Sequence, residues 1–439
     1  MPTPHLLRTW TGETHACADF VAPRTVDELA AAVRAARHVR FLGAGCSMID
    51  RIVPAPGGTL IDMRHFAGLL ALPAAPPMAA TDTTTATVGG GARLDVLTAE
   101  LAARGWALAT VPTQPTVTAA GVMSTGSHNT ARSAPATVAD QVAAITALDA
   151  DGEHVSFTSD ELPAARVGLG ALGPILQVTL RCVPAFELLH AWVERDADAT
   201  FLDLDALLRR HDHLWLNWKL LPNDQERVLI RSADRISGDP PAVTRIAGIE
   251  RVPAWLRLAA RATVKLAARL PALKPALMRS VAARPPVIGA SQHVFFQDID
   301  WISGHDASIA IPIADVPAAR EALCSGFRAA GYQPHLPIQI RFLPASDETL
   351  LGLNAGQAVA VFELMSFTGF TDFPRARQVF CDTLSGFSPR PHWAKGAVGH
   401  VASTFPQASW RAFESLRQRV DPGAKFVSPW LRQVTPLAR

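Results

Sequence analysis

Glycines, small side chains and hydroxyls gather in a few short stretches that could bind a phosphate or a flat ring. The first stretch, "LGAGCSM" (42–48), follows an apolar run that begins at Val39 and has Cys46 near its centre. Glycines let the backbone turn tightly and approach a ligand without interference from a Cβ atom. Successive N–H groups in such a turn form an anion-binding concavity. Taken alone, the stretch predicts either a cofactor loop or an ordinary glycine turn.

Three further stretches have the same character. "TVGGGARLDVL" (87–97) indicates a strand, a glycine turn and a helix. "TAAGVMSTGSHNT" (118–130) packs small residues and hydroxyls around His128, so that its backbone can lie closely against a flat ligand. "RVGLGALGPILQVTL" (166–180) adds three more glycines ahead of a strand. A ligand cradle built from several loops is therefore expected.

Lysine is rare in this chain, and one lysine lies in an unusual setting. The sequence holds 41 lysines and arginines together, of which only five are lysines. Lys395 lies in "RPHWAKG" (390–396), close to His392. A fixed ammonium stabilises negative charge that develops on a reacting group, so Lys395 is a candidate for such a role.

Composition limits the class of protein. The 439 residues allow two or three domains, and 49% hydrophobic and 18% charged residues are typical of a globular chain. A net charge of +2 argues against nucleic acid as the main partner. Five dispersed cysteines without a CxxC pair fit a reducing cytoplasm. We expect no signal peptide and no transmembrane helix, because the apolar runs are too short.

The first 185 residues predict an α+β pattern. "RTVDELAAAVRAARHVRFLGAG" indicates a helix capped by Thr25 and then a strand. "VADQVAAITALDADGEHVSFT" indicates a hairpin, and residues 171–184 indicate a closing strand. The strands are too closely spaced for a simple Rossmann unit, and no GxGxxG follows the first strand.

A second unit begins near residue 186, and it contains a strongly basic segment, 245–284. This segment holds nine basic residues and one acidic residue, and its cations from Arg257 to Arg269 recur every four positions between leucines. A basic amphipathic helix of this kind can lie on an anionic membrane surface. A solvated arginine face on a helical insert is the commoner explanation.

The four loop stretches together resemble the FAD-binding domain of the vanillyl-alcohol-oxidase superfamily, the PCMH type. Within that superfamily the chain is similar to the aldonolactone oxidase and alditol oxidase branch, because "LPIQIRFLPASD" (336–347), "RPHWAKG" and "DPGAKFVSPWL" (421–431) match its later motifs. The resemblance runs from about residue 25 to residue 431. It implies a two-subdomain FAD-binding domain at 1–185, a mixed α/β substrate (cap) domain at 186–387, and a C-terminal segment at 388–439 that returns to the flavin site.

The resemblance also implies which residues hold FAD. The pyrophosphate would lie along the 43–47 turn and the 120–128 loop, and the backbone of Val178 would lie beside the adenosine or the ring. The full set of implied FAD-binding residues is Leu42, Gly43, Ala44, Gly45, Cys46, Ser47, Met48, Ala120, Gly121, Ser124, Thr125, Gly126, Ser127, His128, Val178 and His392.

The first departure from the family pattern is Cys46. The family places at this position the histidine that bonds covalently to the flavin. A cysteine thiolate could form a thioether there, since it is a strong nucleophile. Because relatives without the histidine still hold FAD, we expect FAD to be bound non-covalently.

The second departure is Gln339. The family strand carries Glu-x-Arg, whereas this chain has Gln339-Ile340-Arg341. Glutamine keeps the size and the hydrogen-bonding capacity of glutamate but loses its charge. We therefore expect Arg341 to lose an ion-pair partner and to be a freer cation, suited to an anionic substrate or to developing negative charge.

The sequence thus predicts an FAD-dependent oxidoreductase that removes hydride from a C–H bond beside a hydroxyl of an alcohol or lactone. Oxygen or another acceptor would then reoxidise the flavin, and no metal is expected. Lys395 would lie near flavin N1, and the implied catalytic residues are Lys395, Arg341, Gln339 and His392. Two alternatives stay open: a tailoring or epimerising enzyme for a non-sugar substrate, and a catalytically silent FAD-binding partner protein. The expected location is the cytoplasm, with membrane contact through 245–284 as the alternative.

Overall fold

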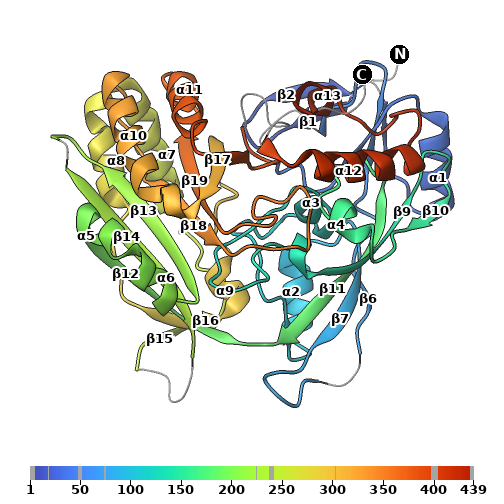
Figure 1. Cartoon of the computed structure of the whole chain (residues 1–439), viewed down its shortest axis with the longest axis horizontal. Helices are drawn as coiled ribbons and strands as arrows, with labels where there is room; N and C mark the ends of the chain where they lie inside the picture. The colour runs from blue at the N-terminus through green and yellow to red at the C-terminus, as the bar shows by residue number, and fades with distance from the viewer. Residues whose placement is uncertain are drawn as a thin grey trace.

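Two systems of β-sheet organise the chain, which passes from one to the other between strands β11 (Ile175–Pro184) and β12 (Glu187–Asp196), as Figure 1 shows. The computed structural model describes residues 5–17, 19–47, 52–73, 76–223, 225–236, 242–301, 303–396 and 404–435. The fold is α+β with the PCMH-type arrangement, as the sequence predicts. The boundaries placed at residues 185 and 387 stay predictions.

The first sheet of the N-terminal half is small and parallel. Its order is β3 (Asp19–Val21), β5 (Thr59–Asp62), β4 (Val39–Leu42). Helix α1 (Val26–Ala35) packs on it through Leu29 and Val33, and the Thr25 hydroxyl accepts a hydrogen bond from the N–H of Glu28. The predicted helix cap and the strand at 39–42 are therefore confirmed. The hairpin of β1 (His5–Arg8) and β2 (Thr14–Cys17) precedes this sheet.

The second sheet of the N-terminal half carries the other subdomain. Its order is β10 (His154–Ser156), β9 (Val142–Leu148), β11, β7 (Thr84–Gly89), β6 (Leu69–Ala71), with β8 (Trp106–Ala107) also paired to β11. Helices α2 (Leu94–Ala102), α3 (Ala119–Ser124) and α4 (Leu162–Ala165) pack around its hydrophobic core. The predicted hairpin is the antiparallel pair of β9 and β10.

The other half is built on one nine-stranded sheet. Its order is β15 (Thr244–Ile246), β16 (Val287–Ala290), β12, β14 (Glu226–Arg235), β13 (His213–Leu220), β18 (Ile338–Leu343), β19 (Val359–Phe367), β17 (Gly304–Pro312), β20 (Arg390–Pro391). All neighbours are antiparallel except β15 and β16. The short helix α9 (Ser291–Phe295) follows β16.

Side chains alternate between the two faces of this sheet, so that one face packs against helices and the other faces the N-terminal half. Helices α5 (Ala197–Leu202), α6 (Leu204–Arg210), α10 (Val316–Ala329) and α11 (Phe373–Leu384) cover one face. Along β18, Ile338 and Ile340 pack beneath these helices. Successive side chains in a strand point to opposite faces, so Gln339 and Arg341 lie on the other face.

The C-terminal segment joins both halves. After β20 completes the large sheet, helices α12 (Gln407–Val420) and α13 (Pro429–Val434) return to the N-terminal half, drawn in red in Figure 1. Trp410 and Phe413 enter its hydrophobic core, and the N–H of Val39 donates to the carbonyl of Lys425. The return of the chain agrees with the expectation drawn from the resemblance.

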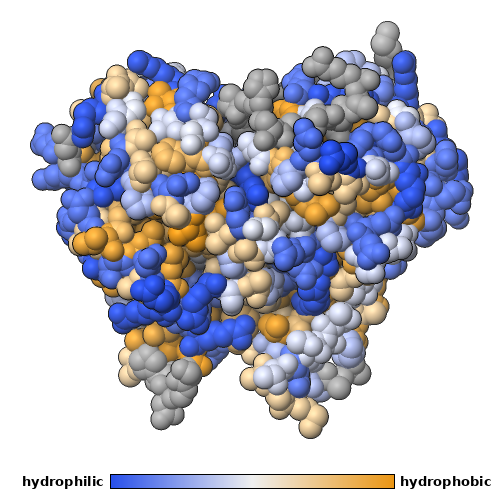
Figure 2. All heavy atoms as spheres, viewed as in Figure 1, coloured by the Kyte–Doolittle hydropathy of each residue, from blue (hydrophilic) through white to orange (hydrophobic). Residues whose placement is uncertain are grey.

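The basic segment 245–284 forms helix α7 (Ala254–Arg269), a 3₁₀ turn and helix α8 (Lys274–Ser280), all in the large-sheet half beside α10 (Figure 1). Within the described ranges, none of the helices has both the length and the apolar character to cross a membrane. The face of the molecule drawn in Figure 2 mixes hydrophilic and hydrophobic residues over both halves.

Candidate active site

A pocket of about 250 Å³ lies where the two halves face each other. Residues from the 43–47 turn, the loop before α3 and the loop at 169–175 line it from the N-terminal half, and Arg341, Glu363 and Lys395 line it from the other half. The large-sheet half thus presents its polar face to the loops of the N-terminal half. The two parts of the lining differ in chemistry.

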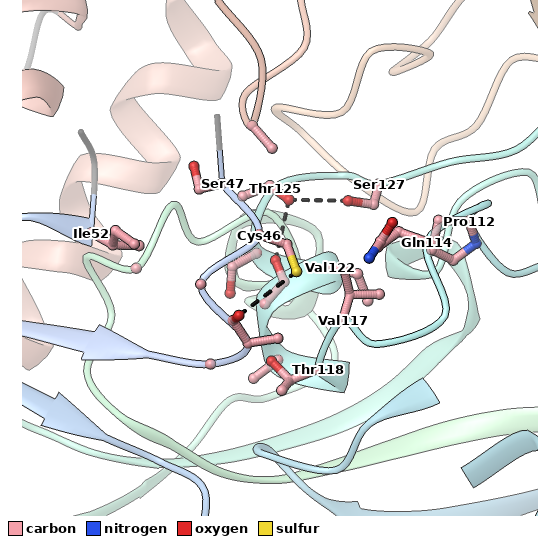
Figure 3. A pocket seen from close by; sticks show the side chains of 18 of the residues that line it. Cys46, Ser47, Ile52, Pro112, Gln114, Val117, Thr118, Val122, Thr125 and Ser127 are labelled. Atoms are coloured by element: carbon pink, nitrogen blue, oxygen red, sulfur yellow. Dashed lines mark hydrogen bonds between the residues drawn. The ribbon is translucent and has the colours of Figure 1, made fainter. Parts of the chain in front are cut away.

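The turn at residues 43–47 follows directly after strand β4 (Figure 3). Gly45 has φ +71°, a backbone conformation that a residue with a Cβ atom rarely adopts. A Cβ added at Gly43 would lie 2.4 Å from the Thr118 hydroxyl, so this glycine lets the two loops touch. The backbone N–H groups of residues 44–46 donate no hydrogen bond to any other described residue. A turn with several unpartnered N–H groups at a pocket suits an anion such as a pyrophosphate.

The loop that follows Thr118 supplies hydroxyls and a buried histidine. The Thr125 and Ser127 hydroxyls lie 3.2 Å apart in the pocket wall (Figure 3). His128 Nδ1 lies 2.8 Å from the carbonyl of Asn129. Burial, with Arg341 nearby, lowers the pKa of His128 to about 3. The ring is therefore neutral, and its Nδ1–H donates to the carbonyl, which leaves Nε2 as an acceptor.

Cys46 faces the pocket but is poorly suited to act as a nucleophile. Its Sγ, labelled in Figure 3, lies 3.7 Å from the Ala44 carbonyl. It also lies 3.9 Å from the Thr116 hydroxyl. Burial is the main cause that raises the pKa of the Cys46 thiol. The thiolate is the reactive form of cysteine, so a raised pKa makes covalent attachment through Cys46 unfavourable.

Arg341 has two partners on the polar face of the large sheet. Its Nε donates to Gln339 Oε1 at 2.9 Å, and its Nη2 lies 3.1 Å from a carboxylate oxygen of Glu363. The side chains of Arg341 and Glu363 are 9% and 3% exposed, so the pair is buried. The expectation that Arg341 is a freer cation is therefore wrong. The neighbouring strand restores the carboxylate that position 339 lacks.

The register of the sheet explains this replacement. Glu363 on β19 lies directly opposite Gln339 on β18 and opposite Ser308 on β17, while Asn217 on β13 lies on the other side of Gln339. Directly opposed residues have Cβ atoms only about 5 Å apart. A carboxylate at either position, 339 on β18 or 363 on β19, can therefore reach Arg341.

Lys395 also has a buried carboxylate partner. Its ammonium pairs with Asp306 on β17, and the Ser308 hydroxyl donates to the same carboxyl at 2.9 Å. Burial raises the pKa of Asp306, and the charge of Glu363 acts in the same direction, whereas Lys395 opposes it. The N–H of Ala394 donates to Nδ1 of His392 at 3.0 Å, and that ring lies 5.3 Å from the ring of His128.

Most of the residues singled out from the sequence line this one pocket. They are Gly43, Ala44, Gly45, Cys46, Ser47, Ala120, Gly121, Ser124, Thr125, Ser127, His128, Arg341, His392 and Lys395. Leu42 and Gly126 lie beside lining residues without lining the pocket themselves. Met48 is outside the described residues.

Two of the predicted residues have other positions. Val178 lies in the middle of β11, paired to both β7 and β9, with its side chain fully buried in the hydrophobic core. Strand pairing on both sides occupies its backbone, so it does not reach the pocket. Gln339 does not line the pocket; it accepts a hydrogen bond from Arg341 and donates one to Asn217 at 3.1 Å.

Sequence reasoning missed Glu363 and Asp306. Each is a single acid within an otherwise apolar strand, "VAVFELMSF" and "GHDASIAIP". Acidic residues are almost never fully buried unless they are paired. That signal was available, although it does not say which cation is the partner.

Comparison with known proteins settles the family. The D-arabinono-1,4-lactone oxidase family matches residues 178–434, more than half of the chain, and an FAD-binding domain matches residues 18–158. The chain belongs to the D-arabinono-1,4-lactone oxidase family. It is an FAD-dependent oxidoreductase of the vanillyl-alcohol-oxidase superfamily, as the resemblance implied.

Relatives of this family align with nearly the whole chain. L-gulono-1,4-lactone dehydrogenase of Mycobacterium tuberculosis is 27% identical, covering 97% of this chain and 98% of that protein. Alditol oxidase of a Streptomyces species is 26% identical with the same coverage. Among solved structures, a solvent-stable cholesterol oxidase matches with a TM-score of 0.82 at 15% identity, covering 98% of this chain and 97% of that one, which shows the shared fold.

The residues present fit FAD. The glycine turn and the hydroxyl-bearing loop would hold the pyrophosphate, and the charged end of the pocket would meet the ring. In the part of the chain that the structure describes, no three histidine, cysteine or acidic side chains are grouped so as to hold a metal ion.

Proposed function

We propose that the chain oxidises a CH–OH group of a neutral, polyhydroxylated small molecule, an aldonolactone or an alditol, with non-covalently bound FAD. The observation that carries this proposal is the pairing of the two cations that the large-sheet half contributes to the pocket. Glu363 neutralises Arg341 and Asp306 neutralises Lys395. A pocket region whose cations are already paired offers little to an anionic substrate but many hydrogen-bond donors and acceptors to hydroxyl groups.

In the proposed reaction Glu363 and Arg341 have different roles. FAD, when bound, accepts the hydride that leaves the substrate carbon. Glu363 lines the pocket and accepts a hydrogen bond from the substrate hydroxyl, then takes its proton as the C–H bond breaks. The alcohol carbon becomes a carbonyl, so the substrate loses one hydride and one proton. Arg341 holds Glu363 in place and donates to the substrate oxygen.

Lys395 places positive charge where negative charge develops. The Lys395 side chain lines the pocket, and its ammonium forms an ion pair with Asp306. A preorganised cation of this kind stabilises the transition state more than the ground state. The presence of a complete set of charged partners argues against a catalytically silent FAD-binding protein.

Non-covalent FAD follows from the chemistry of Cys46. The raised pKa of its thiol and the absence of a histidine at this position both disfavour a bond to the flavin.

We also propose that the natural acceptor is oxygen or another small oxidant, and that the enzyme works in the cytoplasm. Free thiols at Cys46, Cys182, Cys324 and Cys381 support a reducing compartment.

An anaerobic substrate panel tests the proposal. Flavin absorbance is followed after the protein is mixed with aldonolactones, alditols and the aldonate anions that match the lactones. Lactones or alditols should bleach the flavin, and the aldonates should bleach it far more slowly. Faster reduction by aldonates would contradict a neutralised pocket. No bleaching by any alcohol would favour the silent FAD-binding alternative.

A further inference from the structure

Helix α7 exposes an apolar face that no other element of the described structure covers. Trp255, Leu258 and Leu266 are 71%, 71% and 49% exposed, and Leu256 and Leu270 are 42% and 51% exposed. Residues 255, 266 and 270 are spaced four and eleven apart, so they lie on one side of the helix. Large apolar side chains that gather on an exposed face often mark an interaction site.

The opposite side of the same helix is anchored to the protein. Ala267 is fully buried, and Val264 and Ala268 pack against Phe367 and Phe370. This packing means that the helix already has its core contacts. Trp255 and the outward-facing leucines therefore take no part in the packing of the helix against the protein.

Polar contacts fix α7 against the segment that follows α9. Arg257 pairs with Asp298 at 2.6 Å, and Arg261 donates to the carbonyl of Trp301 at 2.7 Å. Ile299, in the same segment, lines the flavin pocket. The helix is thus held rigidly to the large-sheet half, near a wall of the pocket.

Positive charge borders the apolar face. Arg261, Lys265 and Arg269 lie one turn apart along the helix, and Lys265 and Arg269 are exposed. In the described parts of the chain no carboxylate pairs with these three cations. From residue 251 to 284 the sequence has eight basic residues and no acidic one.

We propose that α7 binds an anionic lipid bilayer, with Trp255 and the leucines entering the interface and Lys265 and Arg269 contacting lipid phosphates. An apolar face with tryptophan and leucine, bordered by cations, is the pattern of helices that lie in the plane of a membrane surface. The charge favours this occupant over a second copy of the chain. Two copies packed face to face through α7 would bring like charges together, which is unfavourable.

Flotation of the FAD-loaded protein with vesicles tests the proposal. Vesicles of phosphatidylcholine alone are compared with vesicles that also contain phosphatidylglycerol. The protein should bind the anionic vesicles at least about tenfold more tightly, because each cation near an anionic surface contributes to binding. Added salt should release it, since salt screens exposed charges.

Two variants with matched controls assign the binding to α7. Trp255→Ser with Leu266→Ser should weaken vesicle binding about tenfold or more, because two buried apolar side chains are lost. Leu202→Ser, at a leucine that is 91% exposed on α5, should leave binding unchanged. Unchanged FAD content in each variant shows that the fold is kept.

A second double variant tests the contribution of the cations on α7. Lys265→Glu with Arg269→Glu should weaken binding to anionic vesicles by at least about tenfold. The control, Arg209→Glu with Arg210→Glu on α6, reverses two exposed cations elsewhere in the same half and should bind as the unmodified protein does.

Three results would overturn the proposal. The first is no binding to either kind of vesicle. The second is binding that both control variants weaken as much as the α7 variants do. The third is a dimer in solution that Trp255→Ser with Leu266→Ser converts to a monomer, which would make a second copy the occupant of this face.

Discussion

The loop region and the charged region of the pocket are built by different means. The loop region, residues 43–47 and 118–128, offers mainly backbone N–H groups and small side chains. The charged region offers side chains of Arg341, Glu363 and Lys395, brought together from β18, β19 and the segment after β20. In the proposed function the loop region holds FAD and the charged region meets the substrate. Variants in the loop region should therefore change flavin retention, and variants in the charged region should change the rate of reduction.

The largest effect is expected at Glu363. Glu363→Gln should slow flavin reduction by the substrate by on the order of 10²–10⁴, because the proton acceptor is lost. Flavin content should stay normal, and stopped-flow absorbance measures the rate. The double variant Gln339→Glu with Glu363→Gln places a carboxylate on β18, opposite position 363, where it can pair with Arg341 but does not line the pocket, so the rate should stay low.

Gln339→Glu alone is the control for this exchange. If Glu363→Gln reduces the flavin at the unmodified rate, Glu363 is only a partner for Arg341. The comparison between the two regions would then lose its main support.

A somewhat smaller effect is expected at Lys395. Lys395→Met should slow reduction by on the order of 10²–10³ with little change in substrate binding, because its charge acts chiefly in the transition state. Single-turnover kinetics separate the two effects. Lys395→Met also leaves Asp306 buried and unpaired, so the double variant with Asp306→Asn should be more stable to urea than the single variant. A raised KM with an unchanged rate would instead assign Lys395 to substrate binding.

A change in the loop region should act on the cofactor. Gly43→Ala places a Cβ atom 2.4 Å from the Thr118 hydroxyl and should weaken FAD binding about tenfold. The flavin-to-protein ratio after dilution and ultrafiltration measures this. Adding Thr118→Ala removes the obstructing hydroxyl and should restore retention. A slower rate of reduction in fully loaded Gly43→Ala would show that the two regions are not separable.

The smallest effect is expected at Cys46. Cys46→Ala should release the same flavin into the supernatant on acid precipitation as the unmodified protein does, because the raised pKa of the Cys46 thiol disfavours the reactive thiolate. If the unmodified protein alone keeps a yellow pellet, a cysteinyl bond exists and the loop region contributes covalent chemistry.

The sequence by itself determined the loop region and the family. Glycine turns are local: the left-handed backbone conformation at Gly45 is favoured by the glycine itself, whatever contacts the loop later makes. The alternation in "IQIRFL" likewise places Gln339 and Arg341 on one face of β18 before any partner is known. Helix α1 with its Thr25 cap was predictable for the same reason.

Only the tertiary structure decided the charged region. Glu363 lies 22 positions from Arg341 in the sequence, and the register of β18 and β19 brings the two together. Asp306 lies 89 positions from Lys395, and the segment after β20 reaches it, where the N–H of Gly396 donates to the Asp306 carbonyl. The substitution at position 339 looked like a lost charge because the chain does not state which strands are neighbours. Exposure of the α7 leucines was equally hidden, since an amphipathic pattern does not say which side of a helix meets the protein. Sequence spacing fixes conformation within one element, whereas pairing between elements depends on contacts formed only when the chain folds.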